Sequence, residues 1–147
     1  MSTTTTPPVA ATTRAIDNAS AVSIARRVTV GLGLASIAAI HVLDFPGKLT
    51  ETPYLGVGYI IVIVASLVIM ERLFTRASRI DFIASGVLAA AVFTAFVVNR
   101  TIGMPGAMDD IGNWLEPLGL LSLVVEAFVV WQSLAAFLGG RTAGRIG

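Results

Sequence analysis

The sequence predicts an all-α integral membrane protein, a bundle of four transmembrane helices with both termini in the cytoplasm. Three observations lead to this prediction. Hydrophobic residues make up 55% of the 147 residues and charged residues only 13%, whereas a soluble domain has about a quarter of its residues charged. Four apolar runs are long enough to cross a bilayer at about 1.5 Å per helical residue. The basic residues collect on one side of these runs.

The N-terminal part of the chain combines a polar tail with the first apolar run. Residues 1–23 are rich in Thr, Ala and Pro and lack apolar periodicity, which predicts a disordered cytoplasmic tail. Residues 28–45 are the first run, and the Pro-Gly pair at 46–47 is expected to end its helix, because proline cannot continue the hydrogen bonding. A cleaved signal peptide is the alternative, but the run is long and lacks a small-residue cleavage site.

Three further runs complete the expected transmembrane domain, residues 24–139. Pro117 is expected to begin the last helix, where its missing N–H costs nothing. Residues 140–147 are expected to form a short cytoplasmic tail. The four helices are predicted at about 28–45, 54–73, 80–98 and 117–138.

The distribution of basic residues sets the predicted orientation. One side carries eight of them: Arg14, Arg26, Arg27, Arg72, Arg76, Arg79, Arg141 and Arg145. The other side carries only Lys48 and Arg100. By the positive-inside rule, the N-terminus, the turn between the second and third helices and the C-terminus are cytoplasmic. The expected location is therefore a bacterial plasma membrane, with the other two connections outside.

Composition also excludes several classes of function. The chain has no cysteine and one histidine, which rules out disulfides, thiolate metal sites and His-rich metal sites. It has no basic tract, so no nucleic-acid partner is expected. It has no recognisable catalytic motif, and we expect no enzyme. Asp109, Asp110 and Glu116 could imitate a metal-dependent lipid transferase, but the second acidic motif that such chemistry needs is missing.

Polar residues gather on the predicted outer side. The candidate site for an ion, a proton or a polar network consists of His41, Asp44, Glu51, Arg100, Asp110, Glu116 and Glu126. His41 and Asp44 are three apart and share one helix face, so Asp44 could orient the imidazole. Arg100 is expected to reach carboxylates of the first helix or of the second outer loop. Each feature also has a structural interpretation, such as a helix N-terminal charge at Glu116 or a hydrogen-bonded pair at His41.

Glu126 is the sharpest signal in this set. It lies ten residues after Glu116, about 15 Å deeper along the last helix, which places a carboxyl group near the middle of the membrane. An ionisable group at that depth is costly and is read as functional by default. A hydrogen bond to a serine or tyrosine of a neighbouring helix, or an oligomer partner, is the structural alternative.

Small residues recur along the same helices. Gly119, Ser122 and Ser133 fall on about the same face as Glu126 and form a small, polar stripe expected to point into the bundle. Glycines in the first two helices are expected to be positions of close packing with no ligand implied: Gly31, Gly33, Gly56 and Gly58.

Four segments carry a family resemblance, namely residues 41–48, 51–56, 99–106 and 109–119. Their His, Glu, Arg-Thr-x-Gly-x-Pro and Glu-Pro-x-Gly elements resemble those of a group of small four-helix membrane proteins of actinobacteria. The resemblance covers all four helices and omits the tail. It implies the fold and a bacterial plasma-membrane location, and it implies no reaction.

Two functional hypotheses remain open. In the first, the outer polar cluster binds or passes a small cation or a proton, and its oxygen-rich ligands would suit a hard or borderline divalent cation, although no cofactor is required by the sequence. In the second, the chain is an accessory or structural subunit of a larger membrane complex. Besides the lipid bilayer, the expected partners are a second copy of the chain or another membrane protein.

Overall fold

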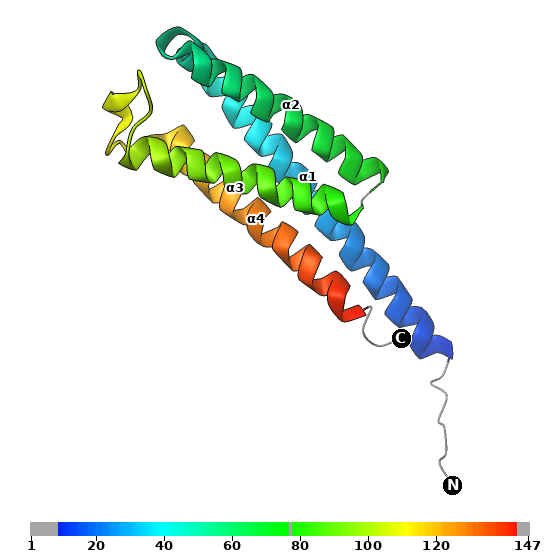
Figure 1. Ribbon diagram of the computed structural model, residues 1–147. Coiled ribbons are helices and arrows are strands. Elements are labelled where there is room, and N and C mark those ends of the chain that lie inside the picture. The colour runs from blue at the N-terminus through cyan, green and yellow to red at the C-terminus, as the bar shows by residue number, and fades with distance from the viewer. Residues whose placement is uncertain (1–8, 77, 144–147) are drawn as a thin grey trace.

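A computed structural model describes residues 9–76 and 78–143, and within these ranges the fold is all-α. The described elements are α1 (Val9–Glu51), α2 (Pro53–Thr75), α3 (Arg79–Thr101), the short 3-10 turn η1 (Met108–Asp110) and α4 (Pro117–Ala143). In this part of the chain, four segments are long and apolar enough to span a membrane: Ser23–Glu51, Pro53–Thr75, Arg79–Thr101 and Pro117–Leu138. The predicted fold class is confirmed to that extent (Figure 1).

Helix α1 is longer at both ends than the sequence suggested. It begins at Val9, so the expectation of a disordered tail is wrong from that residue onward, and residues 1–8 lie outside the described ranges. The predicted stop at 46–47 is also wrong. Pro46 removes only one backbone donor, and the Thr50 hydroxyl donates to the Pro46 and Gly47 carbonyls at 3.2 and 2.8 Å. The helix ends instead just before Pro53, which begins α2.

The opposite turn, between α2 and α3, is fixed by a buried carboxylate that the sequence interpretation overlooked. Ser78 and Asp81 form a capping box: the Asp81 N–H donates to the serine hydroxyl, and the Ser78 N–H donates to the Asp81 carboxylate at 2.9 Å. Arg72 Nε donates to the other carboxylate oxygen at 2.7 Å. This arrangement ties the last turn of α2 to the first turn of α3.

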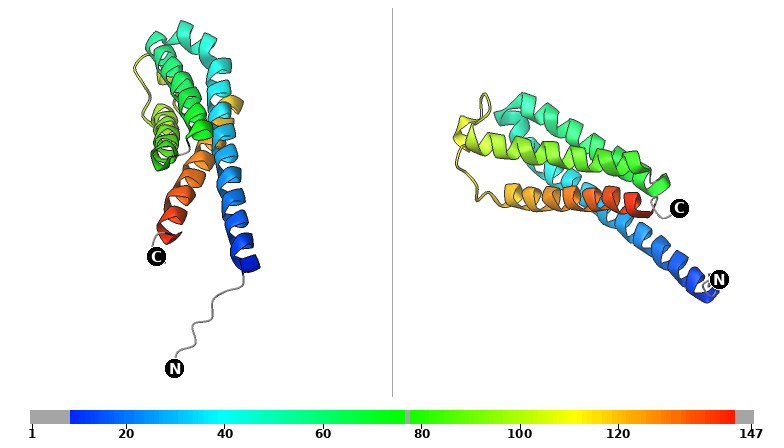
Figure 2. Two further views of the ribbon diagram at one scale, coloured as in Figure 1. Left: turned by 90° about the vertical axis from the view of Figure 1, so that its right-hand side faces the viewer. Right: turned by 60° about the horizontal axis from the view of Figure 1, so that its bottom comes forward.

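The helices pack as two pairs. Helix α1 lies mainly against α2, and α3 mainly against α4, while contacts between α1 and α4 join the pairs. The junction of α1 with α2 and the long α3–α4 connection lie at the same end of the bundle, here called the loop end (Figure 1). The N-terminal part of α1 extends past the other helices at the opposite end (Figure 2).

The apolar core lies away from the loop end. It consists of Val30, Leu34, Ile37, Leu73, Ala89 and Val129. Close packing of α1 depends on glycine here, because a Cβ atom on Gly33 would collide with Val129 and one on Gly31 would lie 2.6 Å from the Phe74 ring. Gly56 meets the Leu49 backbone in the same way, but Gly58 has open space beside it, so its predicted role in packing is wrong.

The outward faces of the helices are apolar as well. Exposed side chains include Leu32, Val57, Ile61, Val87 and Val124. An apolar surface of this extent would be a liability in water and is suited to a hydrocarbon environment. Ser66, Ser85 and Glu126 are buried within the spanning segments, and the exposed hydroxyls of Ser36 and Thr94 donate to carbonyls of their own helices.

Candidate functional site

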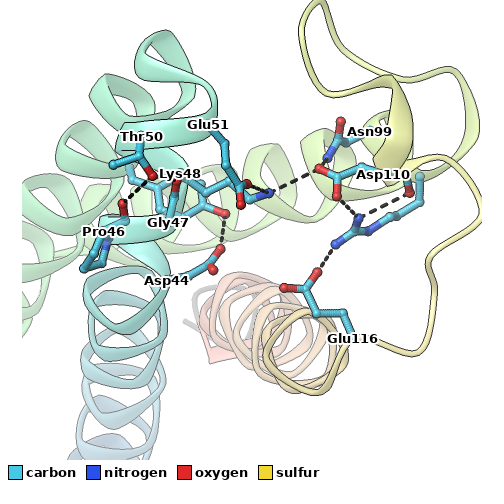
Figure 3. Close-up of polar contacts among 11 residues, drawn as sticks. Asp44, Pro46, Gly47, Lys48, Thr50, Glu51, Asn99, Asp110 and Glu116 are labelled. Atoms are coloured by element: carbon cyan, nitrogen blue, oxygen red, sulfur yellow. Dashed lines mark hydrogen bonds and ion pairs between the residues drawn. The ribbon is translucent and has the colours of Figure 1, made fainter.

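Asp110 is the centre of a hydrogen-bonded network at the loop end. Its carboxylate accepts from Asn99 Nδ2 at 2.8 Å, from Arg100 Nη1 at 2.6 Å and from Lys48 Nζ at 3.3 Å. Figure 3 shows Lys48 approaching from α1 and Asn99 from α3. One acidic side chain of η1 therefore links the α3–α4 connection to two helices.

The partners of Asp110 also control its ionisation. Burial disfavours the charged carboxylate, but hydrogen bonds from Asn99 and Arg100 and the charges of Lys48 and Arg100 outweigh that effect. The pKa of Asp110 is therefore lowered below its usual 3.8. The network is built for an ionised carboxylate at this position.

Arg100 carries the network from Asp110 to α4. Its side chain is only 3% exposed, and its guanidinium bridges Asp110 and Glu116. The group also lies over the Phe96 ring, 4.9 Å from the ring centroid. Arg100 reaches a carboxylate of the second outer loop, as predicted, but in the described structure it makes no bond to a carboxylate of α1.

Lys48, a residue of α1, connects this helix to the network around Asp110. Its ammonium pairs with Asp110 at 3.3 Å and with Glu51 at 3.4 Å. Glu51 itself is 67% exposed and lies at the edge of the network. Of the predicted site residues, Glu51 is therefore the most peripheral.

The expected hydrogen bond between His41 and Asp44 is not formed. His41 Nδ1 lies 2.9 Å from the Ile37 carbonyl, one turn earlier in α1. Asp44 instead accepts from the Tyr59 hydroxyl of α2 at 2.8 Å. The two residues meet through Tyr59, whose ring contacts the imidazole edge-on at a centroid distance of 4.7 Å.

This geometry defines the state of the histidine. A carbonyl can only accept, so Nδ1 of His41 carries a proton and, in the neutral ring, Nε2 is an acceptor. His41 is only 6% exposed. It therefore presents a buried imidazole whose second nitrogen is not used by any hydrogen bond within residues 23–76 and 78–138.

A cavity of about 100 Å³ lies between the helices beneath the network. This volume is enough for several water molecules. Its polar lining consists of His41, Asp44, Lys48, Tyr59, Asn99, Arg100, Glu116, Ser122 and Glu126. Apolar side chains such as Ile40, Val92 and Leu118 form much of the remaining wall. Of the predicted site residues, Glu51 and Asp110 do not line it.

Glu126 lies at the deep end of this cavity. The residue is 0% exposed, and the hydroxyl of Ser122, one turn earlier on the same helix, donates to its Oε1 at 2.5 Å. Its Oε2 has no hydrogen-bond partner in the described part of the chain. The alternative of a hydrogen bond from a neighbouring helix is thus not seen there, and one carboxyl oxygen is left to a ligand, a proton or water.

The apolar core lies beyond Glu126 along α4. Val129 is the next residue on that face of α4, is fully buried, and packs with Leu34, Ile37 and Ala89. Ser133 follows one turn further on, beyond this apolar layer, and does not line the cavity. Of the α4 residues that line the pocket, Glu126 is therefore the furthest from the loop end.

Three members of the site were not among the candidates from sequence. Lys48 and Asn99 donate hydrogen bonds to the Asp110 carboxylate. Tyr59 donates to Asp44 and contacts the ring of His41. Lys48 and Asn99 could have been selected, since each is a polar residue beside a predicted outer helix end. Tyr59 gives no such signal, because it lies within an apolar run and its partner comes from another helix.

The arrangement does not favour a divalent cation. Among the described residues, no group of three or more His, Asp or Glu side chains is placed to hold a metal ion. Asp110, Glu116 and Glu51 are paired with Arg100 or Lys48, and Asp44 is bonded to Tyr59. The oxygen-rich cluster expected from the sequence is thus divided among protein cations and a phenol.

Comparisons with known proteins give no further guide. No model of a protein family, no curated protein and no solved structure matches the sequence.

Proposed function

We propose that this protein is a multi-pass membrane protein that binds a proton or a small monovalent cation at Glu126, through a pocket that opens on the outer side of a bacterial plasma membrane. One observation carries the proposal: a fully buried carboxyl group, with one oxygen lacking a partner among the described residues, ends a polar cavity. A carboxyl group in that position must be protonated or must meet a cation.

The charges around the pocket support a cationic ligand. Carboxylates outnumber basic side chains in the loop-end half of the bundle. The basic residues there are Lys48 and Arg100, and the acidic residues are Asp44, Glu51, Asp109, Asp110, Glu116 and Glu126. Such an excess of negative charge raises the local concentration of cations. The outward direction of the pocket rests on the positive-inside pattern, with both termini in the cytoplasm.

The apolar layer around Val129 supports binding in preference to free passage. On α4 the cavity lining ends at Glu126, one turn before the packed core, which favours access from the loop end. The protein would act as a receptor for its cation, or as the outward-facing state of a carrier.

Infrared difference spectroscopy of the purified protein in lipid nanodiscs tests this proposal. On lowering the pH, we expect a carbonyl band of a buried protonated carboxyl group that is lost in Glu126→Gln and kept in Glu51→Gln, a matched control at the exposed edge. Sodium chloride should shift this titration to lower pH if the site also takes a metal cation, in comparison with N-methylglucamine chloride at equal ionic strength.

A titration that Glu126→Gln leaves unchanged contradicts the proposal. If a second membrane protein also co-purifies in stoichiometric amount, the hypothesis of an accessory subunit replaces it.

A further inference from the structure

The fully buried hydrogen-bonding atoms of the pocket that lack a described partner lie at its two ends. At the deep end, Glu126 offers an oxygen that no described residue contacts. At the loop end, the Arg100 Nε donor and the Asn99 Oδ1 acceptor are likewise buried without a described partner. All three residues line the cavity. An occupant that satisfies them needs a donor at its deep end and an acceptor oxygen at its outer end.

Helix geometry turns these end groups toward each other. Side chains of a helix tilt toward its N-terminus. Helix α4 begins at the loop end, so Glu126 tilts outward, whereas α3 ends there, so Arg100 tilts inward. Glu116, which pairs with Arg100, precedes Glu126 by about 15 Å along the axis. Because the side chains of Arg100 and Glu126 extend toward each other, the gap between them is shorter than this axial distance and suits a small molecule of several carbons.

Part of the wall of the cavity is apolar and can contact carbon. Ile40, Leu55, Val92 and Leu118 line the cavity, together with polar residues that include His41, Asp44 and Tyr59. A bare ion would leave this wall without contacts, and its volume of about 100 Å³ exceeds what one ion fills. An alkyl chain makes the missing contacts and removes apolar surface from water.

Resting on the proposed function, we infer that the cation of this pocket is a small organic primary ammonium whose alkyl chain ends in an oxygen acceptor. The ammonium donates to Glu126, the chain lies against the apolar wall, and the oxygen accepts from Arg100 Nε. The Asn99 carbonyl oxygen can accept from a terminal hydroxyl. Binding is non-covalent and leaves the loop-end network in place.

A matched set of three probes tests each end of this ligand. The melting temperature of the nanodisc protein is measured against 5-amino-1-pentanol, pentylamine, which lacks the oxygen, and 1-pentanol, which lacks the ammonium. We expect saturable stabilisation by aminopentanol, about fivefold weaker binding of pentylamine through the loss of one hydrogen bond, and no response to pentanol. Equal binding of the two amines, or stabilisation by pentanol, overturns the inference.

Three variants locate the response. Glu126→Gln should abolish stabilisation by both amines, and Glu51→Gln should keep it. Val92→Phe should block the cavity sterically with no change in charge, and so abolish the amine response while Glu126 still titrates in the infrared. Since Val92→Phe keeps Glu126, it remains informative if Glu126→Gln does not fold. Amine binding that persists in Val92→Phe overturns the assigned position.

The two proposals fail in different ways. If Glu126 titrates but no amine changes the melting temperature, the ligand class is wrong and the proposed function stands. If the infrared titration is the same in wild type and Glu126→Gln, both are wrong.

Discussion

At the scale of single residues, Asp110 shows how the loop end is held together. Its carboxylate accepts from Lys48 of α1 and from Asn99 and Arg100 of α3, and Arg100 passes the connection on to Glu116 beside α4. Arg100 is 3% exposed, so any loss of its partners leaves a poorly solvated charge.

Removing the charge of Asp110 should therefore destabilise the fold. We expect Asp110→Asn to lower the free energy of unfolding by about 2–4 kcal/mol, because Arg100 keeps only Glu116 as an ionic partner. Unfolding in detergent micelles by denaturant measures this change. Asp109→Asn is the matched control, because Asp109 is exposed and its side chain makes no hydrogen bond or ion pair among the described residues. Equal stability of the two variants contradicts the role given to Asp110.

The lowered pKa of Asp110 makes a second prediction. The unfolded chain binds the Asp110 proton near the usual pKa of 3.8, whereas the folded protein binds it only at lower pH. The contribution of Asp110 is therefore fully present above about pH 3.8 and is lost as the pH falls through the lower folded pKa. Unfolding measured from about pH 6 downward should show a steeper acid loss in wild type and Asp109→Asn than in Asp110→Asn. Parallel curves would show that Asp110 is not held ionised.

The sequence predicted site residues only where a charged or polar residue stands in or beside an apolar run. Glu126 and Arg100 are charged residues in or beside apolar runs, which is sufficient to select them. The choice of partners was not predictable, because His41 bonds to a carbonyl of its own helix and Asp44 bonds to Tyr59. Pairing across helices depends on their relative rotation, which the pattern of one helix does not determine.

At the scale of elements, the helices were predictable and their ends were less so. Helices α2, α3 and α4 begin within one residue of the expected positions. Helix α1 passes through Pro46, because a long helix packed against α2 tolerates the loss of one hydrogen bond and Thr50 satisfies nearby carbonyls. A Pro-Gly pair therefore does not always end a helix when neighbouring helices stabilise it.

The contact between α1 and α4 gives a prediction at this scale. Gly33→Ala should lower the free energy of unfolding by about 1–3 kcal/mol, because its Cβ atom would collide with Val129. Gly58→Ala is the control, since nothing lies within 4 Å of its added Cβ, and it should be neutral or stabilising by up to about 1 kcal/mol. Denaturant unfolding in micelles compares them.

A double variant tests whether residues 33 and 129 are in contact. The Gly33→Ala, Val129→Ala double variant should lose less stability than the sum of the two single variants. Strict additivity would indicate that the two residues do not meet.

At the scale of the whole molecule, the bundle is asymmetric along its axis. Its loop-end half contains the ionic network and the cavity, and its other half contains the apolar core. Hydropathy predicted the four spanning segments, and the basic residues predicted their direction. The cavity was not predictable, because it depends on side chains from several helices meeting at one depth.

The central claim is that the pocket is reached from the loop end, on the outer side of the membrane, and stops at Glu126. The absence of native cysteine allows a direct measurement of this access. Ser122→Cys lines the pocket, and Ser133→Cys lies on the same face of α4 beyond Val129. Each single-cysteine variant is treated with 2-aminoethyl methanethiosulfonate in right-side-out and inside-out membrane vesicles, with a thiol scavenger sealed inside. We predict modification of Ser122→Cys in right-side-out vesicles only, and no modification of Ser133→Cys in that orientation. Protection of Ser122→Cys there, or its modification only in inside-out vesicles, would contradict the account.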